Sequence, residues 1–148
     1  MSTVSDVLRE KGSHVYNIDP HATVFDAIAQ MVRYGVGALM VIEDDNVLGI
    51  LTERDYLRKV AIEGRTSRTT MVHEIMSSPV IAVRPSDDLN QCLALMTERR
   101  VRHLPVIDRG RLIGLVSIGD LVKRKVFEQQ GEIERLVDYI QTAGAAPV

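Results

Sequence analysis

Two segments of the chain, residues 49–55 and 114–120, each place a glycine, a hydroxyl side chain and an aspartate at the same spacing. A carboxylate near the start of a helix can accept hydrogen bonds from both vicinal hydroxyls of a ribose, as the acidic residue of dinucleotide-binding folds does. The glycine would let such a ligand approach the backbone closely. The two sets are Gly49, Thr52 and Asp55, and Gly114, Ser117 and Asp120.

The same spacing is also that of a capping box at a helix N-terminus. In a capping box a Ser or Thr side chain accepts a hydrogen bond from the amide three residues on, and the acidic side chain at that position accepts one in return. Capping alone does not explain why both segments use aspartate rather than glutamate, or why both carry a glycine three residues before the hydroxyl. One set of residues can do both jobs, so both interpretations stay open.

The two segments belong to an internal repeat with a constant offset of 65 residues. With this shift Val15 aligns with Val80 and Asp55 with Asp120, and no gap is needed between them. Because a constant offset over this length does not arise by chance, the chain contains two copies of one structural unit.

Each copy is expected to form a strand, a helix, two strands and a second helix. Apolar residues recur at helical spacing from Val24 and again from Leu89, which places Cys92 in the core. A further apolar helical face follows the second copy, and we expect it to pack on the body. In the first copy the strands are expected at 15–18, 38–42 and 47–51 and the closing helix at 53–62; the second copy should close with a helix at 118 to about 129.

This order predicts an α+β (α/β) fold of tandem β-α-β-β-α repeats packed with pseudo-two-fold symmetry, plus a C-terminal helix. One unit of this size cannot bury both its sheet and its helices, so the two copies should pack together and form clefts at their junction. The expected divisions are a first repeat at 11–64, a linker at 65–74, a second repeat at 75–130, and a C-terminal helix and tail at 131–148.

Composition excludes several classes of protein. A net charge of -2 over 148 residues and the absence of Trp argue against nucleic acid as a partner. The longest apolar stretch, 35–42, is far shorter than the roughly 20 residues of a membrane-spanning helix. The single cysteine and a start that does not resemble a signal peptide predict a cytoplasmic protein with no membrane partner.

No residue pattern points to a metal or to catalysis. The four histidines show no metal-ligand spacing, and no nucleophile elbow is present. We therefore expect no metal and no catalytic residue. Two alternatives stay open: a small nucleotide-processing enzyme that uses Asp55 or Asp120 with a metal, and a structural adaptor in which both aspartates are only helix caps.

With these segments the chain resembles the cystathionine-β-synthase (CBS) domain pair, or Bateman module, in a subgroup that consists of the pair alone. Besides the two glycine, hydroxyl and aspartate segments, the resemblance rests on Arg-His-Leu-Pro-Val-Ile-Asp at 102–108 and Ile-Met-Ser-Ser-Pro-Val at 75–80. It covers nearly the whole chain. It implies a homodimeric, non-catalytic sensor that binds AMP, ADP, ATP, NAD or S-adenosylmethionine between the repeats and modulates an unidentified regulated protein.

The resemblance also implies which residues line each cleft, since such pairs combine the helix start of one copy with the first strand of the other. Asp55 and Asp120 would accept from the ribose hydroxyls, and Thr52 and Ser117 would reach ribose or phosphate. The first cleft would be lined by Ala38, Thr52, Arg54, Asp55, Ser78, Pro79, Val80 and Ile81, and the second by Ser13, Val15, Tyr16, Arg102, His103, Pro105, Ser117 and Asp120.

The copies differ in their basic residues. Arginines after a helix are commonly a solvated face or a favourable charge at the helix C-terminus, and beside a nucleotide cleft they can also bind phosphate. On the second interpretation, phosphate-rich ligands should prefer the Asp120 cleft. Arg99, Arg100, Arg102 and His103 occupy the positions of Tyr34, Gly35, Gly37 and Ala38.

Overall fold

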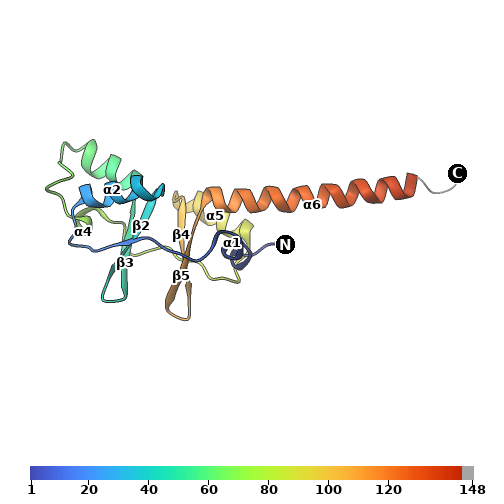
Figure 1. The fold of residues 1–148 in the computed structure, drawn as a ribbon, viewed down its shortest axis with the longest axis horizontal. Coiled ribbons are helices and arrows are strands. Elements are labelled where there is room, and N and C mark those ends of the chain that lie inside the picture. Colours follow the sequence, from blue (N-terminus) through green and yellow to red (C-terminus); the bar gives the residue numbers. More distant parts are fainter. Residues whose placement is uncertain (145–148) are drawn as a thin grey trace.

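Two β-hairpins, one from each repeat, stand beside each other at the centre of the computed structural model, which describes residues 1–144 (Figure 1). Helices flank the hairpins, and a long C-terminal helix extends away from the second repeat. The first repeat contains β1 (Asn17–Ile18), α2 (Val24–Tyr34), β2 (Ala38–Glu43), β3 (Asn46–Thr52), α3 (Glu53–Tyr56) and the π-helical turn η1 (Leu57–Ala61). The second contains α5 (Leu89–Arg99), β4 (His103–Asp108), β5 (Arg111–Ser117) and α6 (Ile118–Gly144).

The hairpins β2–β3 and β4–β5 confirm the paired apolar runs expected from the sequence. Both are antiparallel, and their registers are equivalent, with Ala38 opposite Thr52 and His103 opposite Ser117. Each closes through two residues with positive φ, as a type I′ turn requires. The second turn meets this requirement with a glycine, Gly110 at φ 78°.

The first strand of each copy is shorter than predicted. β1 has only two residues, and it runs parallel to β2 with Asn17 beside Met40. In the second copy the equivalent strand is reduced to a single parallel bridge between Val83 and Val106. Val15 and Val80, which were expected to begin these strands, pack instead into the apolar contact between the repeats.

Two short helices that the sequence analysis did not assign, α1 (Val4–Lys11) and α4 (Val72–Ile75), precede the two repeats. Each packs on the other repeat's core: Val4 and Val7 are buried with the second repeat, and Val72 and Ile75 with the first. Their signal was an apolar pair at i, i+3 spacing next to an acidic capping residue. The two repeats thus exchange their leading helices.

The C-terminal helix differs from the expectation of two separate helices. α6 is continuous from Ile118 to Gly144, and Leu121 near its start is fully buried in the second core. Farther along, Ile133, Leu136 and Ile140 are 55%, 58% and 58% exposed, because the helix leaves the body of the chain (Figure 1). The prediction that this face packs on the body was wrong, and the expected tail at 145–148 lies outside the described residues.

Among residues 1–144, no helix combines the length and the apolar composition that a bilayer crossing requires.

Candidate functional site at the junction of the two repeats

An apolar contact between the two hairpins holds the repeats together. Met40 and Ile50 of the first repeat are buried there, and Leu112 and Leu115 of the second pack against them. This contact fixes the position of each helix start, α3 after β3 and α6 after β5. The candidate ligand residues at both starts are therefore carried on rigid hairpins.

Asp55, at the start of α3, is buried and fully occupied by protein donors. Its Oδ2 accepts from the backbone N–H and the hydroxyl of Thr52, at 3.0 and 3.1 Å. Its Oδ1 accepts from the Ser77 hydroxyl at 3.0 Å and lies 3.1 Å from the Lys59 ammonium. Both oxygens thus have partners, and the capping box is present.

Ser77, which the sequence analysis did not single out, takes the place beside Asp55 that was expected for Ser78. The Ser78 hydroxyl donates instead to the Leu48 carbonyl at 2.8 Å. Ser77 is brought close because its backbone pairs with Ile50 in an isolated antiparallel bridge. This bridge runs past Gly49, where a Cβ would lie 2.7 Å from the Ser77 carbonyl oxygen.

The two motif glycines therefore admit protein rather than a ligand. At Gly114 a Cβ would lie 2.6 Å from a methyl of Leu8, on the exchanged helix α1. The expectation that these glycines open the backbone to a ligand is corrected by these contacts, because the exchanged segments already fill that space.

Asp120, at the start of α6, is less enclosed. Its Oδ2 accepts from the Ser117 backbone N–H at 2.8 Å and from the Lys11 ammonium at 2.6 Å. The Ser117 hydroxyl completes the cap by accepting from the Asp120 N–H at 3.1 Å. Burial raises the pKa of Asp120, but the hydrogen bonds from Lys11 and Ser117 outweigh burial and hold the pKa below its usual value.

Lys11 is the second functional side chain that sequence reasoning missed. It ends α1 and also donates to the Leu115 carbonyl at 2.8 Å. Because α1 is exchanged onto the second repeat, its last turn reaches the start of α6. No periodicity within the sequence indicates this contact, which depends on the exchange.

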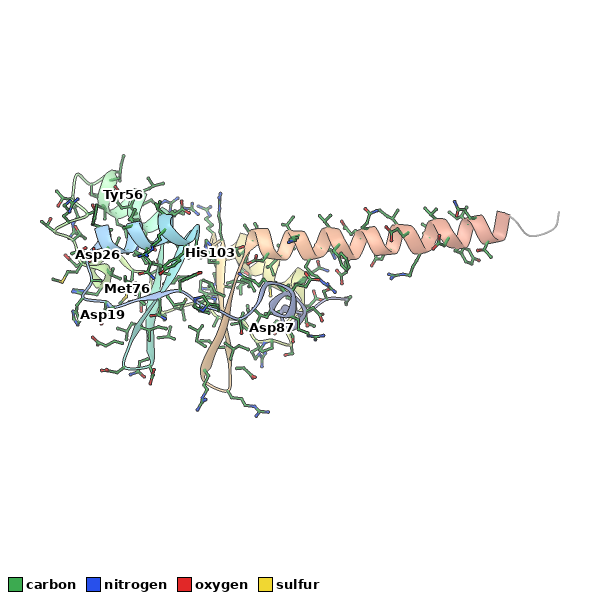
Figure 2. The ribbon with its side chains drawn as sticks, viewed as in Figure 1. Asp19, Asp26, Tyr56, Met76, Asp87 and His103 are labelled. Atoms are coloured by element: carbon green, nitrogen blue, oxygen red, sulfur yellow. The ribbon has the colours of Figure 1, made fainter. Side chains whose placement is uncertain are left out.

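His103 lies on β4 directly opposite Ser117, between the two repeats (Figure 2). Gly37 and Glu53 of the first repeat lie close to this ring. A Cβ built on Gly37 would lie 3.6 Å from His103 Cε1 and 2.5 Å from a carboxylate oxygen of Glu53. Burial lowers the pKa of His103 and nearby Lys11 adds to this, while Asp120 and Glu53 partly offset the shift. The ring is therefore held neutral.

The arginines expected around the second cleft are exposed. Within the described part of the chain, Arg99, Arg100 and Arg102 make no ion pair. Arg54, which was expected to line the first cleft, donates instead to the Arg100 carbonyl at 3.2 Å. Arg100, with a φ of 55°, is the residue that caps the C-terminus of α5, so Arg54 binds a carbonyl just beyond that helix.

The remaining candidate residues are divided between surface and core. Tyr16 stacks on Tyr34 at 4.3 Å between ring centroids, within the first repeat. Ile81 packs against the second core, and Pro105 is buried on β4. Ala38 is buried at the contact between the repeats, whereas Ser13 and Pro79 are exposed.

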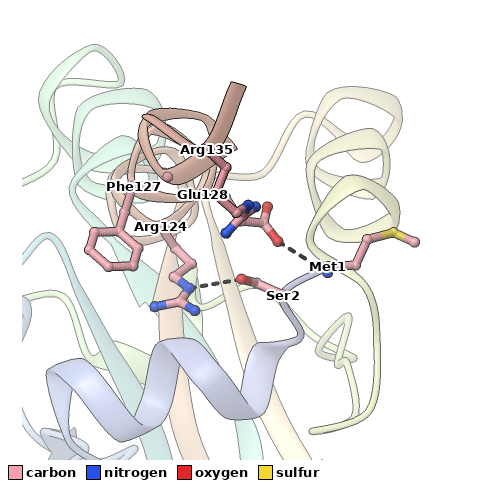
Figure 3. Close-up of a pocket in the computed structure, with 7 residues that line it drawn as sticks. Met1, Ser2, Arg124, Phe127, Glu128 and Arg135 are labelled. Atoms are coloured by element: carbon pink, nitrogen blue, oxygen red, sulfur yellow. Dashed lines mark hydrogen bonds and ion pairs between the residues drawn. The ribbon is translucent and has the colours of Figure 1, made fainter. Parts of the chain in front are cut away.

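A separate hollow lies between the N-terminus and α6 (Figure 3). Arg124 Nε donates to the Ser2 hydroxyl at 2.8 Å, and the N-terminal ammonium lies 3.7 Å from Glu128. These contacts hold residues 1–2 against α6, and the Arg124–Glu10 ion pair joins α6 to α1. We assign the hollow to this attachment, which also positions Lys11.

Comparison with known proteins finds two matches to one family model. Residues 3–62 and 72–126 match the CBS domain family. The CBS domain-containing protein CBSX3, mitochondrial, of Arabidopsis thaliana is 42% identical and spans 95% of this chain and 72% of its own length.

Two solved structures share this architecture. A CBS-domain protein from Burkholderia ambifaria MC40-6 is 49% identical, with a TM-score of 0.84 over 86% of this chain and 96% of that one. Hypoxic Response Protein I, solved with two coordinated zinc ions, is 29% identical, with a TM-score of 0.68 over 84% of this chain and 99% of that one.

Proposed function

This chain belongs to the CBS domain family, and we propose that it is a non-catalytic sensor that binds an adenine nucleotide beside Asp120. Binding would change the affinity of the chain for a regulated partner protein. AMP, ADP, ATP and NAD are the ligands that this proposal covers.

The observation that carries the proposal is the carboxylate oxygen Oδ1 of Asp120. Among residues 1–144, both hydrogen bonds to this side chain end on Oδ2, and the side chain is 24% exposed. Oδ1 is thus available to accept from a ribose hydroxyl. Asp55 offers no such atom, because Ser77 and Lys59 occupy its Oδ1.

Two cations beside Asp120, Lys11 and Arg102, are the proposed contacts for the phosphate of a ligand. Lys11 places an ammonium 2.6 Å from the carboxylate, and Arg102 is exposed without an ion pair within the described residues. A phosphate close to these groups would gain charge-assisted hydrogen bonds. His103, held neutral, would face the base rather than add charge.

The proposed mechanism is a population shift. The residues beside Asp120 come from two parts of the chain, since Lys11 ends α1 while His103 and Ser117 belong to the second hairpin. A ligand that contacts both α1 and the second hairpin stabilises the arrangement in which they lie together. The partner protein would read that arrangement, and the coupling between ligand and partner is reciprocal.

Calorimetric titration with AMP, ADP, ATP and NAD tests the binding step, with GTP as the base control. We expect Asp120→Ala to weaken ATP binding by at least about tenfold, because each lost bond to a carboxylate is worth about 1.5 to 3 kcal/mol. Arg102→Ala should reduce the salt dependence of binding. ATP affinity equal to that of the wild type in Asp120→Ala would refute the ribose role.

The two alternatives predict different results in the same assay. A structural adaptor gives no heat with any adenine nucleotide. An enzyme that uses the aspartates consumes bound nucleotide, which chromatography of the incubated mixture detects. Unchanged nucleotide together with saturable binding would support the sensor.

We also propose that the chain is a homodimer. An apolar groove of about 480 Å³ lies between α2 and the segment formed by α3 and the start of η1, and Val32 and Leu57 on its border are 78% and 59% exposed. Such contiguous apolar surface marks interaction sites. Light scattering should give twice the chain mass, and Val32→Glu with Leu57→Glu should give a monomer, whereas Thr69→Glu should not. A wild-type monomer or a higher oligomer would contradict the dimer.

We propose a cytoplasmic location because the single cysteine, Cys92, is a free and buried thiol. Burial raises the pKa of Cys92 to about 11, with Asp87 and Asp88 adding to the shift, so the thiol stays protonated and unreactive. Such a chain has no need of an oxidising compartment. Cell fractionation tests the location, and recovery in an organelle would contradict it.

A further inference from the structure

Three potential metal ligands meet at the outer edge of the first repeat. His21 Nε2 lies 3.0 Å from Glu43 Oε2, and one ligand atom each of Asp19, His21 and Glu43 lie within 4.8 Å of one another. In Figure 2 Asp19 lies at the far side of the first repeat from His103, so this cluster is distinct from the nucleotide cleft.

The topology explains why these residues meet although they are distant in sequence. β1 and β2 are parallel, so their carboxyl ends lie at the same edge of the sheet. Asp19 follows the last residue of β1, and Glu43 is the last residue of β2. The Asp19 carboxylate accepts from the His21 backbone N–H at 2.7 Å, which orients the loop that carries the imidazole.

A second histidine lies next to this cluster. The ring centroids of His21 and His73 are 5.6 Å apart, and the rings are inclined at 69°. Two imidazoles on one tetrahedral zinc ion have centroids roughly 5 Å apart, given a Zn–N distance of about 2.0 Å. His73 is held there because its backbone N–H donates to the Pro20 carbonyl at 3.0 Å.

We propose that Asp19, His21 and Glu43 bind one divalent transition-metal ion of the zinc class, and that the His73 ring, which lies outside the 4.8 Å cluster, turns inward to become the fourth ligand. A tetrahedral site places neighbouring ligand atoms roughly 3.3 Å apart, close to the observed separation of His21 and Glu43. The sequence suggested no metal because the four ligands lie in three separate segments: the loop after β1, the end of β2, and α4.

The donor set selects the class of metal. Imidazole nitrogen favours zinc and its first-row neighbours, whereas magnesium and calcium prefer all-oxygen sites. His21 is 67% exposed at its side chain and Glu43 is 40% exposed, so the ion can enter from solvent with little rearrangement.

The second repeat provides an internal comparison. At the positions equivalent to Asp19, His21 and Glu43 it carries Arg84, Ser86 and Asp108. This set has a cation and no imidazole, so it lacks the ligands that the first repeat offers. The proposed site belongs to the first repeat alone and ties its edge to α4, the helix that leads into the second repeat.

Equilibrium dialysis of the tag-free, chelator-treated chain against Zn²⁺, with metal analysis of the retained protein, tests the proposal. We expect one zinc per chain and little retention of Mg²⁺ or Ca²⁺. His21→Ala and Glu43→Gln should each weaken zinc binding by at least about tenfold, and His73→Ala by about tenfold. His14→Ala, a histidine outside the cluster, should bind as the wild type does.

Circular dichroism without metal confirms that each variant is folded, which these exposed positions should allow. Zinc should also raise the melting temperature of the wild type and of His14→Ala but not that of His21→Ala. Zinc retention that is equal in wild type and His21→Ala, or lower in His14→Ala than in His21→Ala, would overturn the proposal. Equal retention in His73→Ala would remove His73 from the ligand set.

Discussion

Asp55 and Asp120 hold equivalent positions in the two repeats, and both cap the helix that follows their hairpin. Their surroundings differ because the exchanged segments differ. Asp55 meets the Ser77 hydroxyl from the chain after α4, together with Lys59, and both its oxygens are occupied. Asp120 meets Lys11 at the end of α1, and within residues 1–144 the hydrogen bonds to its carboxylate all end on Oδ2.

This difference shows that a duplicated motif can diverge in role while its local structure is kept. The capping hydrogen bonds are nearly the same in both repeats. What each carboxylate can do beyond capping depends on the segment exchanged onto it. We therefore regard Asp55 as a structural residue and Asp120 as the proposed ligand residue.

Removing each carboxylate in a separate variant should give the largest difference in stability between the two repeats. Asp55→Ala should lower the free energy of unfolding by about 2 to 3 kcal/mol, because it removes a buried carboxylate and leaves its partly buried donors, Ser77 and Lys59, unpaired. Asp120→Ala should cost only about 1 kcal/mol, the typical loss of a helix cap. Urea unfolding of both variants measures this, and equal losses would break the distinction.

The motif glycines give a second contrast. An alanine at position 49 would place its Cβ against the Ser77 backbone, which cannot move without breaking its bridge to Ile50. At position 114 the Cβ would meet only the flexible end of Leu8. We expect Gly49→Ala to cost about 2 kcal/mol and Gly114→Ala about 1 kcal/mol by chemical denaturation. The opposite order would show that the exchanged segments are held differently.

Loss of Lys11 should have a smaller effect on stability. Its side chain is 35% exposed, so its ion pair with Asp120 is screened by solvent and worth less than about 1 kcal/mol. Lys11→Met should also raise the pKa of Asp120, whose stabilising effect would then be lost at a higher pH as acid is added. Unfolding curves between neutral and acid pH, compared with Lys123→Met as control, check this. If the variant lost stability at the same acid pH as the wild type, Lys11 would not be what lowers the pKa of Asp120.

The smallest expected effect concerns His103. Because the folded chain holds its pKa below the value in the unfolded chain, the stabilising effect of the neutral ring is complete above about pH 6.5 and declines as the pH falls below that value. His103→Gln should reduce the fall in melting temperature between about pH 7.5 and pH 5.5. His14→Gln is the control, and the same slope in both variants would contradict the prediction.

Several features of the molecule were determined by the sequence alone. The repeat, both hairpins, the position of Cys92 in the core and the two capping boxes followed from spacing and residue type. These features depend on contacts within a few residues or on a periodicity that burial imposes, so local pattern is sufficient to reveal them.

Other features were decided by the tertiary structure. The exchange of α1 and α4 brings Lys11 to Asp120 and Ser77 to Asp55, and the parallel pairing of β1 with β2 brings Asp19 to Glu43. Each of these contacts joins residues from separate elements, and no short-range spacing encodes them. Their physical origin is the burial of apolar faces such as Val4 with Val7 and Val72 with Ile75, which selects a partner surface only when the whole chain is packed.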